Sequence, residues 1–158
     1  MRKAQSERIM AAFLVSLAAG VAAAQDKRAD NTDLIREKVR ADKKVVVASV
    51  LALTESEAKV FWPVYNAYQG DMVSHYDRVL KLIDTYAKAY DTMTDETATT
   101  LLNQALALER DHVALLNSYV ARFRKVLPAK KVARLYQVEN KIRALVNYEL
   151  ARDIPFVK

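Results

Sequence analysis

The fold is decided by the stretch LTESEAKVFWPVYNAYQ, which runs from Leu53 to Gln69. Thr54 is followed three residues later by Glu57, and this capping-box pattern, in which each side chain satisfies a backbone N–H of the other residue, predicts that a helix begins here. Beyond the cap, apolar side chains recur at steps of four, three and four, which places them on one face of the helix. They are Phe61, Tyr65, Tyr68 and Met72. We interpret this face as a core-facing seam, with an exposed binding surface as the alternative.

The composition predicts an all-α fold. The chain of 158 residues is 52% hydrophobic and contains 2 glycines, 3 prolines and no cysteine. So few turn-forming residues indicate long helices joined by short connections, because sheets and loop-rich folds need many more of them. The net charge of +6 comes from basic residues interleaved with acidic ones, so it does not indicate a nucleic-acid partner. Neither a cofactor nor a disulfide is expected.

The N-terminal residues 1–24 have the pattern of a secretory signal peptide. Basic residues precede an apolar stretch from Ile9 to Val21, and the alanines at 22–24 offer a cleavage site. The apolar stretch is shorter than the roughly 20 residues that a membrane span needs, so an uncleaved anchor is the less favoured alternative. We therefore expect export to a bacterial periplasm, with no stable membrane insertion after cleavage.

A single helical domain is predicted for residues 32–158, after a flexible polar tail at 25–31. Caps and apolar periodicity place its four helices at about 32–52, 55–90, 95–126 and 129–151. The second and third helices are expected to form a long antiparallel hairpin. Pro63 is expected to bend the second helix, because proline removes a backbone donor and clashes with the preceding turn.

Two of the predicted helix starts carry a resemblance to a known family. The Spy/CpxP group of periplasmic helical proteins is marked by a Leu-Thr-x-x-Gln motif that occurs twice, each time at a helix start. Leu53, Thr54 and Glu57 are similar to the first copy, and Leu127 and Pro128 stand in the place of the second. The resemblance implies a four-helix, cradle-like protein that can form a homodimer and acts in envelope stress. It also implies two kinds of partner, unfolded envelope proteins held by an ATP-independent chaperone or the periplasmic domain of a sensor kinase.

The sequence predicts a non-enzymatic binding protein. It contains no cysteine, no glycine-rich loop and no histidine within a recognisable nucleophile motif, so the usual parts of hydrolases and phosphate-binding enzymes are missing. An aromatic surface surrounded by basic side chains would hold unfolded clients weakly and attract acidic segments. The candidate residues are Phe61, Trp62, Tyr65 and Tyr68 for the client patch, with Arg78, Lys81, Arg122 and Arg124 around it.

Metal binding is the alternative function that the sequence leaves open. Asp71 and His75 share one face of the second helix, and Glu109 and His112 share one face of the third. A hairpin that turns near residues 92–94 brings the two histidines to the same height. Two histidines and two carboxylates could hold Zn²⁺ in a periplasmic sensor or storage protein. The competing interpretation is a pair of hydrogen-bonded structural histidines.

Overall fold

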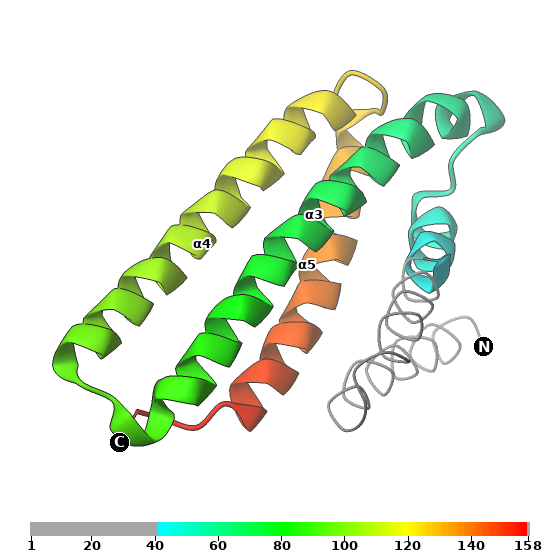
Figure 1. Cartoon of the computed structure of the whole chain (residues 1–158). Helices are drawn as coiled ribbons and strands as arrows, with labels where there is room; N and C mark the ends of the chain where they lie inside the picture. The colour runs from blue at the N-terminus through cyan, green and yellow to red at the C-terminus, as the bar shows by residue number, and fades with distance from the viewer. Residues whose placement is uncertain (1–40, 158) are drawn as a thin grey trace, which may run out of the picture. The chain divides into compact units, whose positions relative to one another are not determined.

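The computed structural model describes residues 41–157, and all of its regular elements are helices (Figure 1). They are a helix over 41–51, α3 (Glu55–Ala89), the short 3-10 helix η1 (Tyr90–Thr92), α4 (Asp95–Phe123) and α5 (Ala129–Asp153). No strand occurs in this part of the chain, so the predicted all-α class is confirmed. The predicted signal peptide, the tail at 25–31 and the start of the first predicted helix lie outside the described residues.

The helix bounds agree with the sequence prediction except at the end of α4. This helix ends at Phe123 rather than near residue 126. The backbone N–H of Lys125 donates to Arg122 at 3.1 Å and that of Val126 donates to Phe123 at 3.0 Å. These shorter-range bonds tighten the chain into a turn ahead of Pro128, which is a common way to satisfy the last groups of a helix.

The start of α3 is fixed by the predicted capping box. The backbone N–H of Glu57 donates to Thr54 Oγ1 at 3.2 Å, and the backbone N–H of Thr54 donates to Glu57 Oε2 at 2.8 Å. Ahead of this cap, Ala52 has a φ of 45°, the left-handed conformation that commonly ends a helix. The preceding helix and α3 are therefore separate elements.

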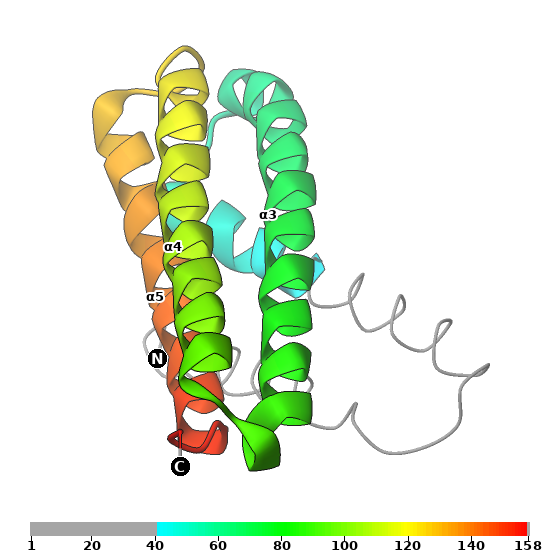
Figure 2. The same ribbon diagram turned by 60° about the vertical axis from the view of Figure 1, so that its left-hand side comes forward.

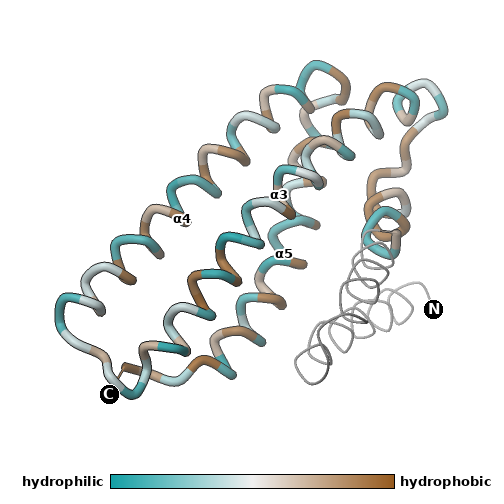
Figure 3. Tube along the Cα trace, in the orientation of Figure 1, coloured by the Kyte–Doolittle hydropathy of each residue, from teal (hydrophilic) through white to brown (hydrophobic). Residues whose placement is uncertain are grey.

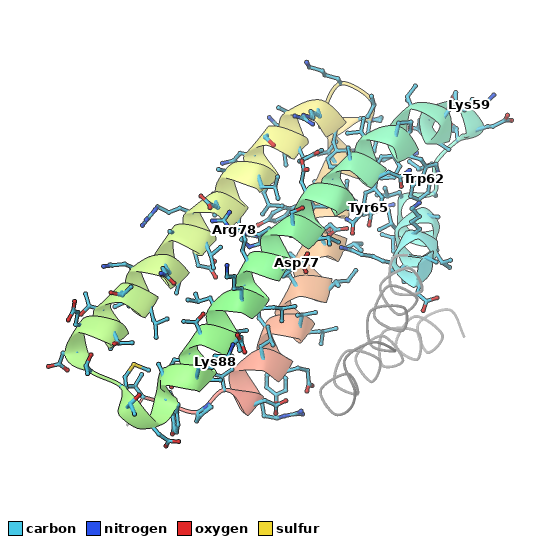
Figure 4. All side chains as sticks on the ribbon, in the orientation of Figure 1. Lys59, Trp62, Tyr65, Asp77, Arg78 and Lys88 are labelled. Atoms are coloured by element: carbon cyan, nitrogen blue, oxygen red, sulfur yellow. The ribbon has the colours of Figure 1, made fainter. Side chains whose placement is uncertain are left out.

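Pro63 lies inside α3, which continues through it without a break. The ribbon changes direction along the stretch from Lys59 to Tyr65 (Figure 4). Proline cannot donate to the carbonyl four residues earlier and its ring crowds that turn, so a bend is the expected relief.

The chain divides into two compact units, each described by itself. The first contains Ala133–Asp153 together with the chain up to Leu53, and the second contains Thr54–Val132 with the C-terminal residues from Ile154. The single domain predicted for 32–158 therefore stays a prediction. In the first unit, Val47 and Leu51 are buried, and Lys43 Nζ contacts Glu139 Oε2 of α5 at 2.8 Å.

The second unit is built on an antiparallel hairpin of α3 and α4, which lie side by side in both views (Figures 1 and 2). Hydrophobic and hydrophilic positions alternate along both helices, as amphipathic helices require (Figure 3). None of the helices in the described part of the chain is long and apolar enough to cross a membrane. The buried apolar residues of the hairpin are Phe61, Tyr65, Tyr68, Met72, Leu101, Leu108, Tyr119 and Phe123.

Candidate functional site

Five aromatic side chains fill the hairpin near the start of α3 and the end of α4. We call them the aromatic seam: Phe61, Tyr65 and Tyr68 of α3 with Tyr119 and Phe123 of α4. Ring centroids lie 5.7 Å apart for Phe61 and Phe123, 5.2 Å for Tyr68 and Tyr119, and 5.8 Å for Tyr68 and Phe123. These spacings fall in the range of favourable aromatic pairs, most of them edge-to-face or tilted. The seam is therefore a packed core.

This packing corrects the predicted client patch. Phe61, Tyr65 and Tyr68 are buried, so the core-facing interpretation of the stripe is confirmed and an exposed surface made of all four aromatics is wrong. Their four-residue and three-residue spacing points them at α4. Trp62 follows Phe61 directly, so it projects from a different side of the helix, and it is the one candidate aromatic that is only half-buried. Its ring still contacts Phe61, with centroids 4.9 Å apart.

The four predicted basic residues are all exposed, but they do not form one ring around the aromatics. The Arg122 guanidinium lies 4.5 Å from the centroid of the Tyr119 ring, and Arg124 follows at the end of α4, so these two belong to the aromatic end of the hairpin. Arg78 contacts Asp111 Oδ2 at 2.6 Å, further along the hairpin. Lys81 lies almost one turn beyond Arg78 on α3, away from the aromatic seam.

His75 of α3 and His112 of α4 face each other inside the hairpin, as the turn position predicted. We call these two residues the histidine pair. Both are buried, and their ring centroids lie 5.3 Å apart. Arg78 of α3, labelled in Figure 4, forms an ion pair with Asp111 of α4, and both charges are close enough to His75 to influence its pKa.

The predicted four-residue zinc site is not formed. Asp71 Oδ2 accepts a hydrogen bond from the Tyr119 hydroxyl at 2.6 Å, so this carboxylate joins the aromatic seam and not the histidine pair. Among residues 41–157 no group of three or more histidine, cysteine or acidic side chains is arranged to hold a metal ion. The physical reason is the position along the hairpin. Asp71 lies one helical turn before His75, where Tyr119 of α4 is the residue opposite it and donates the hydrogen bond.

Burial and neighbouring charges shift two titratable groups of the hairpin. The pKa of His75 is lowered by burial and then by the Arg78 cation, against the opposing influence of Asp111 and Glu109. The pKa of the Tyr119 hydroxyl is raised by burial and by its hydrogen bond to Asp71, while Arg122 opposes that shift. Both shifts favour the neutral form of a buried ring, as desolvation does in general.

An ion pair connects the first motif-like stretch, which contains Thr54 and Glu57, to the second, which begins at Leu127 and Pro128. Glu57 Oε2, which closes the capping box at the first, also accepts from Lys131 Nζ at 2.6 Å. This contact lowers the pKa of Glu57, with the Lys131 hydrogen bond as the first cause and the Thr54 backbone as the second. Leu127 of the second stretch is buried, and Pro128 precedes α5 with its carbonyl accepting from the backbone N–H of Lys131 at 2.9 Å. The ion pair was missed in the sequence, although Glu57 and Lys131 stand at equal distances from Leu53 and Leu127 and carry opposite charges.

Sequence reasoning also missed an apolar face of α4 that the hairpin does not cover. Leu102, Leu106 and Val113 are 59%, 48% and 53% exposed, and we call them the α4 stripe. Their spacing of four and seven residues, which places them on one helix face, was the signal that could have revealed it.

Comparison of the chain with protein-family models, with curated proteins and with solved structures gives no match. The class that fold and site define is an all-helical protein with an antiparallel hairpin around an aromatic core. Membership of the Spy/CpxP group stays a prediction.

Proposed function

We propose that this is an exported, non-enzymatic binding protein that holds unfolded segments of other envelope proteins without ATP. The observation that carries the proposal is the position of Trp62 in the first turns of α3. Its indole is half-buried, and it contacts the buried Phe61 ring with centroids 4.9 Å apart. A half-exposed indole on a rigid base offers apolar contact area at little entropic cost, which suits weak binding of many chains.

Two nearby cations favour client segments that contain acidic residues. Arg122 and Arg124 are exposed at the end of α4, and Phe123 between them contacts Phe61, so the cations belong to the same end of the hairpin as Trp62. Cations at the rim of an apolar surface attract acidic residues and keep the surface soluble. The expected client is therefore an unfolded segment in which apolar side chains stand next to acidic ones. A folded sensor-kinase domain is the alternative partner.

A single tryptophan makes the proposal directly testable. Because Trp62 is the only tryptophan of the chain, its fluorescence reports on the proposed surface alone when the client contains none. We expect equimolar protein to suppress aggregation of an unfolding client, measured by light scattering, and the Trp62 emission to shift to the blue as the indole is covered. Aggregation that proceeds unchanged, without an emission shift, would remove the client-binding function and favour the sensor-kinase partner.

Two variants test whether binding depends on Trp62 or is non-specific binding to any exposed aromatic side chain. Trp62→Ala removes the half-buried indole, and we expect it to abolish aggregation suppression. Tyr148→Ala removes an aromatic that is 66% exposed on α5, and it should leave suppression unchanged. Equal losses in both variants would contradict the assignment to Trp62. Export has a separate test: N-terminal sequencing of the protein from the envelope should find Gln25 as the first residue.

A further inference from the structure

The turn between α4 and α5 carries a cluster of cations. The sequence over residues 122–132 is RFRKVLPAKKV, which contains no acidic residue. Four exposed side chains of this segment, which we call the basic corner, are Arg122, Arg124, Lys125 and Lys130. Arg122 lies over the Tyr119 ring, and within residues 41–157 none of the four forms an ion pair with a carboxylate.

The acidic residues at this end of the hairpin do not neutralise the basic corner. The start of α3 lies close to the start of α5, because Glu57 pairs with Lys131 at 2.6 Å. Glu55 pairs with Lys59 within α3 at 3.1 Å. Each of these two carboxylates is therefore matched by a lysine outside the basic corner, which keeps its own positive charge.

The opposite end of the hairpin is acidic. Residues 84–96 contain four acidic side chains and a single cation, Lys88, which pairs with Asp84 at 2.6 Å. The other acidic side chains are Asp91, Asp95 and Glu96. The turn after α4 and the turn before it lie at opposite ends of the hairpin (Figure 1). The 29 residues of α4 separate them by about 40 Å, so positive and negative charge are divided along the hairpin.

The arrangement of the basic corner suits a charged plane better than a single small anion. A site for one carboxylate or phosphate needs donors that are held in place, whereas attraction to a charged plane depends on net charge and distance. Among the cations, the turn also presents small apolar residues. Val126 is half-buried, and Pro128 and Ala129 are exposed. Small apolar contacts together with cations favour binding at the level of lipid headgroups.

We propose that the basic corner binds the surface of a membrane that contains anionic phospholipids. The hairpin stands on the membrane with its acidic end pointing away. At about 40 Å the acidic end is several Debye lengths from the lipid, since one Debye length is about 8 Å at physiological ionic strength, so repulsion is screened. A hairpin lying flat would bring the acidic residues to the anionic surface. The periplasm, where the chain is expected, is bounded by phospholipid.

The contact is expected to be weak and reversible. Each cation at an anionic surface raises partitioning by about fivefold, so four cations give a preference of several hundredfold over a neutral surface. The proposal goes beyond client binding and does not depend on it. Lys125 and Lys130 are not among the residues proposed to hold clients, so either function can fail while the other remains.

Co-sedimentation with vesicles tests the lipid specificity. The protein should bind vesicles of equal parts phosphatidylglycerol and phosphatidylcholine at low salt, and it should not bind vesicles of phosphatidylcholine alone. About 1 M salt shortens the Debye length to about 3 Å and should release the protein. Equal binding to both kinds of vesicle, no binding to either, or binding that salt leaves unchanged would overturn the proposal.

Two double variants with the same change in net charge locate the contact. K125E/K130E reverses two exposed cations of the basic corner and should lower binding by about 25-fold or more, with unchanged far-UV circular dichroism. K81E/R110E reverses two exposed cations elsewhere on α3 and α4 and should keep most of the binding. Arg110 lies about 20 Å from Arg124 along the helix, beyond the Debye length. Equal losses would mean that only net charge matters and would overturn the assignment.

Single fluorescent labels test the orientation. The chain contains no cysteine, so a label can be attached at Ala129→Cys in the turn or at Thr100→Cys near the acidic end, both exposed. A quencher on the lipid headgroups should reduce the emission of the label at residue 129 and leave that at residue 100 unchanged. Equal quenching would mean that the hairpin lies flat and would overturn the upright orientation.

An acidic polypeptide is the competing partner for the same cations. Polyglutamate, added at the same concentration of negative charge as the vesicle surface, should leave most of the protein on the anionic vesicles. The reason is that lipid headgroups also contact the small apolar residues of the turn. Displacement of most of the protein would show a preference for acidic segments and would overturn the assignment to lipid.

Discussion

The aromatic seam and the histidine pair occupy the same face-to-face interior of one helical hairpin, yet they differ in what holds them there. In the seam, rings contact rings and burial itself is favourable, with one hydroxyl satisfied by Asp71. At the histidine pair, burial opposes the charge that an imidazole can acquire, and the pKa of His75 falls. Helical periodicity places either kind of side chain inside. The chemistry of the buried side chain then decides whether its contribution to stability depends on pH.

The largest loss of stability should come from removing a ring from the aromatic seam. Phe123 contacts rings of Phe61 and Tyr68 and is buried, so Phe123→Ala should lower the free energy of unfolding by about 3–5 kcal/mol. Urea denaturation followed by circular dichroism measures it. Leu80→Ala, at a half-exposed position of α3, is the control and should change stability by about 0.5 kcal/mol or less. Similar losses in both variants would mean that the seam is not the core of the hairpin.

Lowering the pH should reduce the free energy of unfolding through His75, whereas the aromatic rings of the seam do not titrate in this range. Because the folded pKa of His75 is lowered, the unfolded chain binds protons more readily, and stability falls as pH drops below the ordinary histidine pKa of about 6.5. Above that pH the contribution is fully present. The charged neighbours are Arg78, which strengthens the effect, and Asp111 and Glu109, which weaken it.

Urea midpoints measured from pH 7.5 down to 5 test this dependence. The midpoint of the wild type should decrease through this range, and His75→Gln should make the decrease shallower because its amide does not titrate. A His75→Gln protein as acid-sensitive as the wild type would place the sensitivity elsewhere in the chain.

A smaller loss of stability should follow from removing the hydrogen bond between Tyr119 and Asp71 at the edge of the aromatic seam. Tyr119→Phe keeps the ring but loses the hydrogen bond to Asp71, and we expect a loss of about 1 kcal/mol in the free energy of unfolding. Asp71→Asn retains an oxygen acceptor and should lose less. If Tyr119→Phe were as stable as the wild type, the hydroxyl would contribute nothing to the hairpin.

The smallest effect concerns Gly70, which lies on α3 between the seam and the histidine pair. A Cβ at this position would meet no atom within 4 Å, so alanine fits without displacing anything. Gly70→Ala should raise the free energy of unfolding by about 0.5–1 kcal/mol, because glycine loses more conformational freedom in a helix interior. Thermal denaturation would detect the increase, and a lower midpoint would indicate that α3 needs its flexibility between the two levels.

Much of the fold was predictable because its signals are local. The cap at Thr54 fixes the beginning of α3, and the cap at Thr94, whose Oγ1 accepts from the backbone N–H of Thr97 at 3.2 Å, fixes the beginning of α4. With both starts known, the turn position set the height of His75 against His112. Capping and periodicity act over one or two turns, so a single chain reveals them.

The candidate site was only partly predictable because contacts between distant residues decide it. Sequence placed Phe61 and Trp62 in one patch, and only the packing of α3 on α4 buried the first and left the second half-exposed. Asp71 lies within reach of His75 by sequence spacing, but the hydroxyl of Tyr119 lies opposite it across the hairpin. The capping pattern revealed the role of Glu57 in its helix and not its ion pair with Lys131.

The sequence by itself determined the helical class, the helix starts and the alignment of the hairpin, since these follow from backbone capping and from which residues share a helix face. The tertiary structure alone decided which aromatics form the core, which carboxylate meets which partner, and that within residues 41–157 the α4 stripe is exposed. The physical reason is that burial and hydrogen-bond partners depend on the face of the neighbouring helix. That face is brought into place by residues far away in the chain.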